Sequence, residues 1–331
     1  MAGGQERELR RRIRSVGATR KITRAMELIA ASEMARAQSR ISGARPYVEG
    51  ISAVLAVTAA EAVGAERLIG TPDEARNCLL VAVVSDRGLA GGYNNNVLRT
   101  ALRHMRDGEA QGRSYRLVTV GRKAVSFFRF NGREVTESFS GMTDRPRFED
   151  ARRIAEPVVG PFLAGEVDLV ELVSTRFLSA GSQRVEVRQV LPLPPAEQLA
   201  AERAERAEHD AAPVSAEAEA EANAQGALYE FEPSPEEILQ LLVPQYAEAL
   251  LYQILLEASA SEHTARQRAM ASATENADEL ITTYRRAMNR ARQDSITTEI
   301  MEIVGGAEAL RATGGPERGH VDLANAEERS A

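Results

Sequence analysis

The stretch Cys78-Leu-Leu-Val-Ala-Val-Val84, followed by Ser85-Asp-Arg-Gly-Leu-Ala-Gly-Gly-Tyr-Asn94, decides the fold of the middle of the chain. A short, continuous apolar run that ends in turn residues is typical of a strand covered on both faces of its sheet. The spacing of Asn94–Met105 is helical, and strand and helix patterns alternate from there to Leu193. This alternation predicts a Rossmann-like α/β domain with a mostly parallel sheet over residues 66–194.

The other elements of this domain follow from the same patterns. We expect strands at Arg116–Val120, Arg133–Phe139, Val167–Ser174 and Arg184–Val190. We expect helices at Lys123–Phe130 and Phe148–Leu163, the second in spite of an internal proline.

Long helical patterns flank the domain, in residues 1–65 and in residues 235–310. Their apolar residues recur at steps of three, four and seven, which is the spacing of a coiled coil. The expected stripe positions include Ile22, Ile29, Leu280, Ile281, Ile296, Ile300 and Ile303.

Each narrow apolar stripe must be buried against a partner, and the two long helices can bury their stripes against each other. At about 1.5 Å per residue they would be rods of about 80 and 110 Å. We therefore expect a long antiparallel coiled coil of the N- and C-terminal helices, with the α/β domain beside one end. Pro46 and Pro244 should kink these helices, because proline removes a backbone hydrogen bond.

Charge is distributed unevenly along the chain. Residues 1–45 contain 11 Lys and Arg against 4 Asp and Glu, whereas residues 196–237 contain 2 Arg against 12 Asp and Glu. The Ala/Glu-rich composition of the second region predicts an acidic linker and foot segment over residues 195–234, without a packed core. Residues 311–331, with Gly314-Gly-Pro316 and mixed charge, are expected to be a disordered tail.

Composition argues against several classes of protein. The single cysteine, Cys78, excludes a disulfide framework, and the four scattered histidines lack metal-ligand spacing, so we expect no metal and no cofactor. The longest clean apolar run has seven residues, far fewer than the ~20 that a bilayer span needs. The charged N-terminus lacks the apolar core of a signal peptide.

The loop after the first strand lies where a nucleotide-binding loop would be. Its glycines, Gly88, Gly91 and Gly92, fit neither the dinucleotide-binding fingerprint nor the P-loop spacing. We therefore interpret it as a structural turn, in which Asp86 and Arg87 form a local ion pair or loop-fixing hydrogen bonds.

The basic N-terminal helix allows three interpretations. Its arginines suit a solvated helix face, a surface for the carboxylates of a protein partner, or a surface for nucleic acid or anionic lipid. No aromatic residues alternate with these cations, which disfavours nucleic acid.

Three segments together resemble the gamma subunit of F-type, proton-translocating ATP synthase. Ile13-Arg-Ser-Val-Gly-Ala-Thr-Arg-Lys-Ile-Thr-Arg-Ala-Met-Glu-Leu-Ile-Ala-Ala-Ser32 is similar to the opening signature of that family. Ser85–Asn94 is similar to its central loop. Asn289-Arg-Ala-Arg-Gln293 and Ile296-Thr-Thr-Glu-Ile-Met-Glu-Ile-Val-Gly-Gly-Ala307 are similar to its closing signature. The resemblance covers about residues 5–310, less the acidic linker.

The resemblance implies a rotor without catalytic residues of its own. In that family the two terminal helices form a central stalk inside a ring of alternating alpha and beta subunits. The α/β domain, with the epsilon subunit, docks on the membrane c-ring. Proton flow turns the stalk, which drives ATP synthesis on the beta subunits, or hydrolysis in reverse. The resemblance also implies a delta subunit as partner, one copy per complex, no nucleic acid, and a peripheral position on the cytoplasmic face of a bacterial plasma membrane.

The closing signature implies a contact with a beta subunit. By resemblance, Arg292, Gln293 and Thr297 would contact a catch loop of that subunit. Two residues nearby differ from the usual family pattern. Met288 stands where the family usually has Tyr, and Asp294 stands where a small residue is common.

Two further contact regions are implied by the resemblance. Lys21, Arg24 and Met26 would lie at a lower contact with the beta subunits. Tyr229 and Glu230 belong to the segment that would reach the c-ring and epsilon. The acidic linker and the tail are longer than the family pattern, and we hypothesise that one of them tunes ATP hydrolysis.

Two functions of other classes remain open on the residues alone. One is an α/β enzyme with a dimerising coiled coil, which a ligand-induced shift in heat stability would reveal. The other is a basic coiled-coil tether or nucleic-acid-binding protein with an α/β domain, which salt-dependent retention on DNA would support.

Overall fold

The fold is taken from a computed structural model, which describes residues 2–62, 67–70, 75–195 and 231–313. In chain order its elements are α1 (Ala2–Glu61), β1 (Asn77–Val83), α2 (Tyr93–Ala110), β2 (Ser114–Val120), α3 (Arg122–Phe130), β3 (Glu137–Phe139), α4 (Phe148–Leu163), β4 (Leu169–Phe177), β5 (Gln183–Leu191) and α7 (Pro235–Thr313).

Five strands form one sheet in the order β3-β2-β1-β4-β5. The first four strands are mutually parallel, and β5 pairs antiparallel with β4 at the edge. Connections through α2, α3 and α4 join the parallel strands, as such a sheet requires. The predicted fold class is therefore confirmed.

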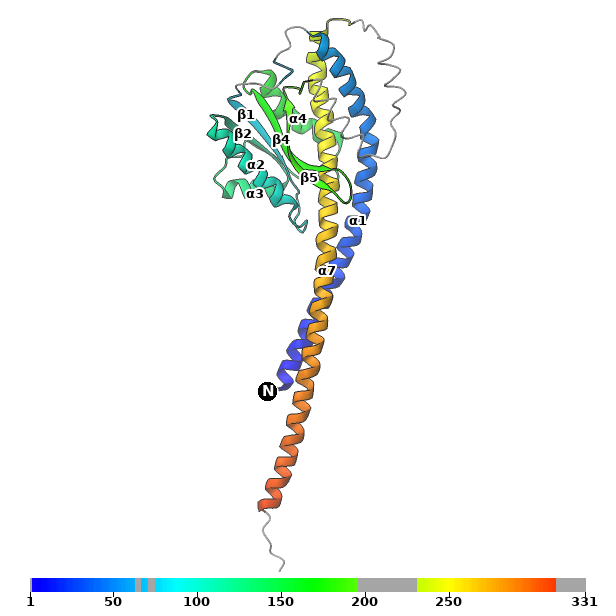
Figure 1. Cartoon of the computed structure of the whole chain (residues 1–331), viewed down its shortest axis with the longest axis vertical. Helices are drawn as coiled ribbons and strands as arrows, with labels where there is room; N and C mark the ends of the chain where they lie inside the picture. Colours follow the sequence, from blue (N-terminus) through cyan, green and yellow to red (C-terminus); the bar gives the residue numbers. More distant parts are fainter. Residues whose placement is uncertain (1, 63–66, 71–74, 196–230, 314–331) are drawn as a thin grey trace, which may run out of the picture. The chain divides into compact units, whose positions relative to one another are not determined.

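Helices cover both faces of this sheet, which explains the unbroken apolar run in β1. Leu79, Val81 and Val83 belong to the core on the side of α4 and the long helices, whereas Leu80 and Ala82 belong to the core under α2 and α3. Figure 1 shows the sheet between these two layers. An alternating polar face would have no place in such a strand.

The predicted elements of the sheet domain are present, but one strand is much shorter than expected. α4 covers Phe148–Leu163 as predicted. The pattern predicted a strand over Arg133–Phe139, whereas β3 has only three residues. The amide of Arg133 donates to the carbonyl of Phe128, which closes the end of α3. The residues after it therefore complete that turn before the strand begins.

The chain divides into two compact units, residues 23–272 and residues 1–22 with 273–331. The first unit contains the sheet and its three covering helices. In its core, Val48, Ile51 and Leu55 of α1 join Leu250 and Ile254 of α7, and the two helices run antiparallel (Figure 1).

The second unit, described in residues 2–22 and 273–313, pairs the start of α1 with the end of α7. A guanidinium nitrogen of Arg20 lies 2.6 Å from a carboxylate oxygen of Asp278. The side chain of Arg12 is hydrogen-bonded to that of Tyr284. In this antiparallel register, Ala2 comes opposite a position near residue 295.

The predicted stripe of α1 is wrong in its middle. Ile22 and Ile29 are 61% and 63% exposed, whereas Thr23, Ala30 and Ala37 are buried. These buried residues repeat every seven positions, so the predicted coiled-coil spacing is correct, but the predicted side of the helix is not the buried one. Small side chains let helices approach closely, and this geometry outweighs the burial of the larger neighbours.

The predicted stripe of α7 is also wrong toward its end. Ile281 is buried as predicted, but Leu280 is 45% exposed, and Ala277 is buried in its place. Ile296, Ile300 and Ile303 are exposed as well, because α1 begins opposite residue 295 and the described chain has no helix left to cover them.

Candidate functional site

Three polar side chains of α7 are buried where this helix passes the loops of the sheet domain. Glu262, His263 and Arg266 are 2%, 3% and 8% exposed. Arg266 donates to one carboxylate oxygen of Glu262, and its second terminal nitrogen lies 3.4 Å from Nδ1 of His263. It also approaches the carbonyl of Gly88, at 3.5 Å. Spacings of three and four residues place all three on one side of the helix.

The loop between β3 and α4 joins this cluster to α1. Nε2 of His263 lies 3.3 Å from the carbonyl oxygen of Asp144, which also accepts a 3.0 Å hydrogen bond from Ser259. The next residue, Arg145, forms a two-point ion pair with Glu33 of α1, with its Nε 3.2 Å from Oε2. We call Glu33, Asp144, Arg145, Glu262, His263 and Arg266 the polar junction.

The protonation of the polar junction is governed by burial and by its arginines. The Arg145 guanidinium lowers the pKa of Glu33. Burial lowers the pKa of His263, and its two contacts fit a neutral ring that donates from Nε2 and accepts from Arg266 at Nδ1. Burial raises the pKa of Glu262 although Arg266 opposes the shift. Oε2 of Glu262 has no hydrogen-bond partner among the described residues.

The loop Ser85–Asn94 is built around the carboxylate of Asp86. One oxygen accepts from the amide of Gly141 at 2.8 Å and from Oγ1 of Thr143 at 3.0 Å. The other oxygen accepts from the amide of Arg122 at 3.1 Å. Asp86 therefore holds three loops together at the carboxyl ends of the strands, where an open doubly wound sheet would bind a ligand.

The other residues of this loop lie near Asp86. The carbonyl of Arg87 accepts from the hydroxyl of Ser85, and the Arg87 side chain is exposed. Gly91 has φ of 55°, and a Cβ there would lie 3.7 Å from the Cβ of Ala269. Gly88 and Gly92 flank it, and Gly92 immediately precedes α2.

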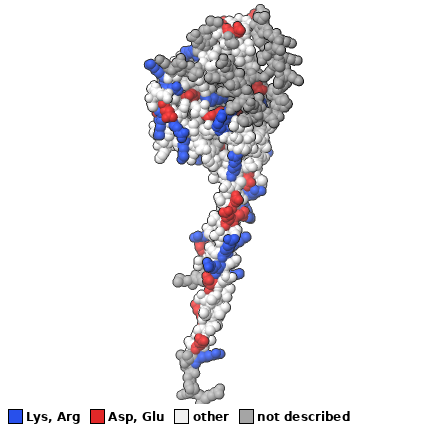
Figure 2. Space-filling view, in the orientation of Figure 1, with Lys and Arg blue, Asp and Glu red and all other residues white. Residues whose placement is uncertain are grey.

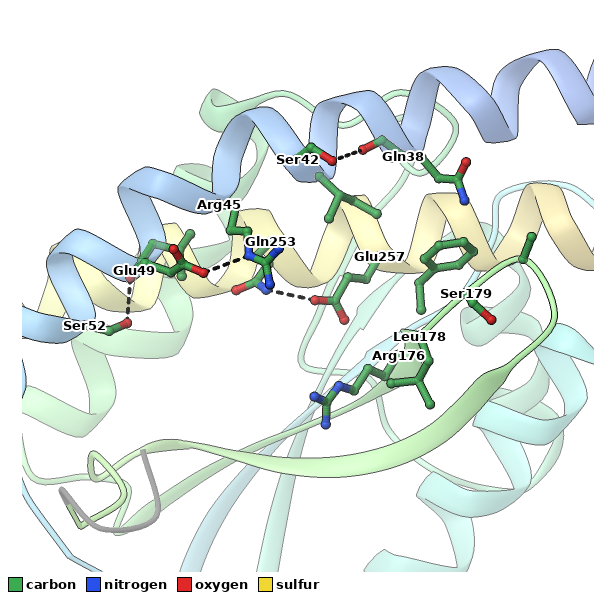
Figure 3. Close-up of a pocket in the computed structure, with 14 residues that line it drawn as sticks. Gln38, Ser42, Arg45, Glu49, Ser52, Arg176, Leu178, Ser179, Gln253 and Glu257 are labelled. Atoms are coloured by element: carbon green, nitrogen blue, oxygen red, sulfur yellow. Dashed lines mark hydrogen bonds and ion pairs between the residues drawn. The ribbon is translucent and has the colours of Figure 1, made fainter. Parts of the chain in front are cut away.

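A cavity of about 420 Å³ lies between α1, α7 and the hairpin of β4 and β5 (Figure 3). Polar side chains on its wall bond to each other: Arg45 lies 2.7 Å from Glu49, and Gln253 donates to Glu257 at 2.9 Å. These bonds link the wall of the cavity along each helix.

The residues expected at the lower beta contact lie on α1. Lys21 and Arg24 are exposed, and Met26 is half-buried. Arg24 forms a 2.8 Å ion pair with Glu27, one turn away on the same helix.

The residues expected at the catch contact lie near the end of α7. Arg292, Gln293 and Thr297 are all exposed. Large apolar side chains lie near them along the helix, and three of these, Ile296, Ile300 and Ile303, belong to the stripe that the sequence predicts to be buried. Those that are 48–76% exposed are Ile296, Ile300, Met301, Ile303, Val304 and Leu310.

Tyr229, Glu230, the acidic linker to residue 230 and the tail from residue 314 lie outside the described residues. Across the described ranges, no helix is long and apolar enough to cross a bilayer, and no three His, Cys, Asp or Glu are placed to hold a metal ion.

The chain is similar to proteins of one family along nearly its whole length. The profile of the ATP synthase family matches residues 5–310. An ATP synthase gamma chain of Parafrankia sp. is 44% identical over 313 residues, which are 93% of this chain and 98% of that one. An ATP synthase gamma chain of Kineococcus radiotolerans is 42% identical, over 94% of this chain and 98% of its own.

Solved structures share the fold. A chain of the Euglena gracilis mitochondrial ATP synthase superposes with a TM-score of 0.62 at 17% identity, over 96% of this chain and 98% of that one. A chain from the central stalk and c-ring structure of the Tetrahymena thermophila mitochondrial ATP synthase gives 0.54 at 24% identity, over 76% of this chain and 99% of that one.

Proposed function

The chain belongs to the ATP synthase family, among its gamma chains, and from this membership we propose that it works as the rotor of the central stalk. The rotor couples proton flow through a c-ring to ATP synthesis or hydrolysis on beta subunits, and it carries no catalytic site itself. The observation that carries this proposal concerns α7. One part of this helix is anchored in the sheet domain, and another part presents apolar side chains that its own described chain leaves uncovered.

The partners follow from the same role. The chain enters the complex in one copy, inside a ring of alternating alpha and beta subunits, and meets epsilon, delta and the c-ring at its other parts. The complex lies on the cytoplasmic face of a bacterial plasma membrane. The polar junction supports the role, since it ties the sheet domain to α1 through Arg145 and to α7 through Asp144.

The beta contacts are assigned to exposed residues of the two long helices. Arg292, Gln293 and Thr297 form the catch contact, beside the uncovered apolar side chains of α7. Exposed ion pairs are worth only ~0–1 kcal/mol each, so such contacts break easily as a rotor turns. Each contact favours one state of the ring over the others, which is how binding energy couples to rotation.

The remaining contacts are assigned to other parts of the chain. Lys21, Arg24 and Met26 of α1 form the lower beta contact, and the exposure of the two cations supports it. Tyr229 and Glu230 belong to the segment that reaches epsilon and the c-ring. The acidic linker or the tail tunes ATP hydrolysis.

Reconstitution with the alpha and beta subunits of the same organism tests the role. We expect the complex mass to give one copy per three alpha–beta pairs, and sustained ATPase turnover only when the chain is present. Failure of the chain to enter the complex, or full turnover without it, would remove the proposal. A variant that lacks residues 196–227, and another that lacks residues 314–331, should assemble but differ from the full chain in hydrolysis rate if that segment is regulatory.

A further inference from the structure

The outer side of α2 and α3 gathers exposed cations. These helices pack on the sheet through Val97, Ala101 and Phe128, and their opposite side faces solvent. Figure 2 shows Lys and Arg side chains projecting from this part of the molecule. The exposed cations of the two helices, which we call the basic face, are Arg99, Arg103, Arg106, Arg122, Lys123 and Arg129.

The charges of the basic face are poorly compensated by the rest of the described chain. Arg99, Arg103, Lys123 and Arg129 form no ion pair with any described carboxylate. α3 contains no acidic residue, and of the two in α2, Glu109 is already held by Arg133. Like charges at successive helical turns repel one another, so an anionic partner would stabilise this surface.

The chain itself contains a segment of opposite charge. Residues 196–230 have nine Asp and Glu against two Arg, a net charge of −7. The segment leaves the sheet domain just after β5 and returns just before α7, and both attachment points belong to the unit of residues 23–272.

Length does not restrict where this segment can bind. Its 35 residues span at most about 120 Å when fully extended, at ~3.3–3.6 Å per residue. Tethering at both ends holds it at an effective concentration of the order of millimolar, which favours it over free anionic partners in dilute solution.

We propose that the acidic segment 196–230 docks on the basic face and acts as an internal competitor for other anionic partners of that face. The interaction is electrostatic and depends on charge more than on residue order. It weakens with salt, because the screening length falls from about 10 Å at 0.1 M to about 3 Å at 1 M. This inference goes beyond the rotor role and does not depend on it.

The lysines of the chain provide a direct test. Lysine occurs only twice, as Lys123 in the basic face and as Lys21 on α1. A carbodiimide joins a lysine amine to a carboxylate in contact with it, with no spacer. In the full-length protein at low salt, we expect peptide mapping to find Lys123 joined to carboxylates of residues 196–230, with at least fivefold less product at 1 M NaCl. Products at Lys123 that involve only other carboxylates would overturn the proposal.

Mixing isotopically light and heavy chains separates docking within one chain from docking between copies. We expect the joined peptides to be all light or all heavy. Mixed peptides would show that the basic face binds the segment of a second copy, which contradicts the proposal.

Two matched variants identify the cause. One replaces the nine acidic residues of 196–230 by Gln and Asn, and the other keeps all nine but scrambles the order of the segment. We expect the first to lose the Lys123 products and the second to keep them within about twofold. Loss in both variants would indicate a sequence-specific site and overturn the charge-driven account.

A heparin column tests the competition. The neutralised variant should elute at higher salt than the full chain, because its basic face is no longer occupied, while the scrambled variant should elute with the full chain. Equal elution of all three proteins would contradict the proposal and would leave the basic face as a surface for external polyanions such as nucleic acid. Triple substitution of Arg99, Arg103 and Arg129 by Gln should abolish the difference between the variants.

Discussion

Two regions of helix α7 differ in whether their side chains are buried or exposed. Between Leu239 and Arg266 it buries both apolar and charged residues against the sheet domain and α1. Between Ile296 and Leu310 it exposes nearly every large apolar side chain. The first region is stabilised by contacts within the chain. The second is left uncovered by the described part of the chain, as the proposed contacts with other subunits would require.

Removing the carboxylate of the buried ion pair between Glu262 and Arg266 should lower the free energy of unfolding more than any other change in the first region of α7. Glu262→Ala leaves the guanidinium of Arg266 buried without its carboxylate, and breaking a buried pair in this way costs about 3–5 kcal/mol. Urea unfolding followed by circular dichroism would measure it. The double variant Glu262→Leu with Arg266→Met should recover most of the loss, since an apolar pair of similar volume needs no compensation. A single-variant loss below about 1 kcal/mol would show that water reaches the polar junction.

The second largest effect should come from truncating apolar side chains, which should destabilise the first region of α7 much more than the second. Leu250 is 1% exposed, and Leu250→Ala should lower the free energy of unfolding by about 2–5 kcal/mol through lost transfer energy and a cavity. Ile300 is 54% exposed, and Ile300→Ala should change it by less than about 0.5 kcal/mol. The comparison fails if both variants lose similar stability in the same urea titration.

The polar junction should make stability depend on pH in a way that the end of α7 does not. Burial lowers the pKa of His263 in the folded chain, so the unfolded state binds its proton more readily. The contribution of His263 is therefore complete above its ordinary pKa, about 6.5, and is lost as pH falls below that value. Melting temperatures at steps from pH 7.5 to 5 should fall less steeply in His263→Gln.

The stability that Glu33 contributes should be lost at lower pH than that of His263. Its pKa is lowered by Arg145, so its stabilising effect is present above its ordinary pKa and is lost on further acidification. A His263→Gln variant with an unchanged slope between pH 7 and 5 would mean that other groups cause the acid sensitivity.

Substitutions in the proposed catch contact should have the smallest effect on the chain and a clear effect on the complex. Arg292→Ala should leave unfolding of the isolated chain unchanged, because Arg292 is exposed. It should lower the ATPase rate of the reconstituted complex. Arg286→Ala is the matched control, an exposed arginine of the same helix outside the proposed contact, and should leave the rate unchanged. Equal effects of the two variants would remove Arg292 from the contact.

The sequence predicted the sheet domain well because its signals are local. The run Cys78–Val84 is typical of a strand covered on both sides, and the structure places residues 79–84 alternately in two cores. The long helices were predicted for the same reason. The buried faces of these helices were not predicted correctly. Thr23 and Ala30 are buried while Ile22 and Ile29 are exposed, because small side chains let the helices approach closely.

The polar junction was missed for a different reason. Glu33, Asp144 and Glu262 lie far apart in sequence, and each looks like an ordinary surface carboxylate until the fold brings it to its arginine or histidine. The only local signal was the spacing of Glu262 and Arg266 by four residues. The contact residues Arg292, Gln293 and Thr297 came from family resemblance, and their assignment stays a prediction.

The central claim is that this chain turns as one rotor, with the sheet domain tied to the long helices. The most direct test holds the alpha–beta ring on a surface and attaches a bead to the sheet domain through Ala110→Cys, at the exposed end of α2, since the native Cys78 is buried. The account predicts that the bead turns in one direction when ATP is added. A bead that stays still while the same complexes hydrolyse ATP would contradict it.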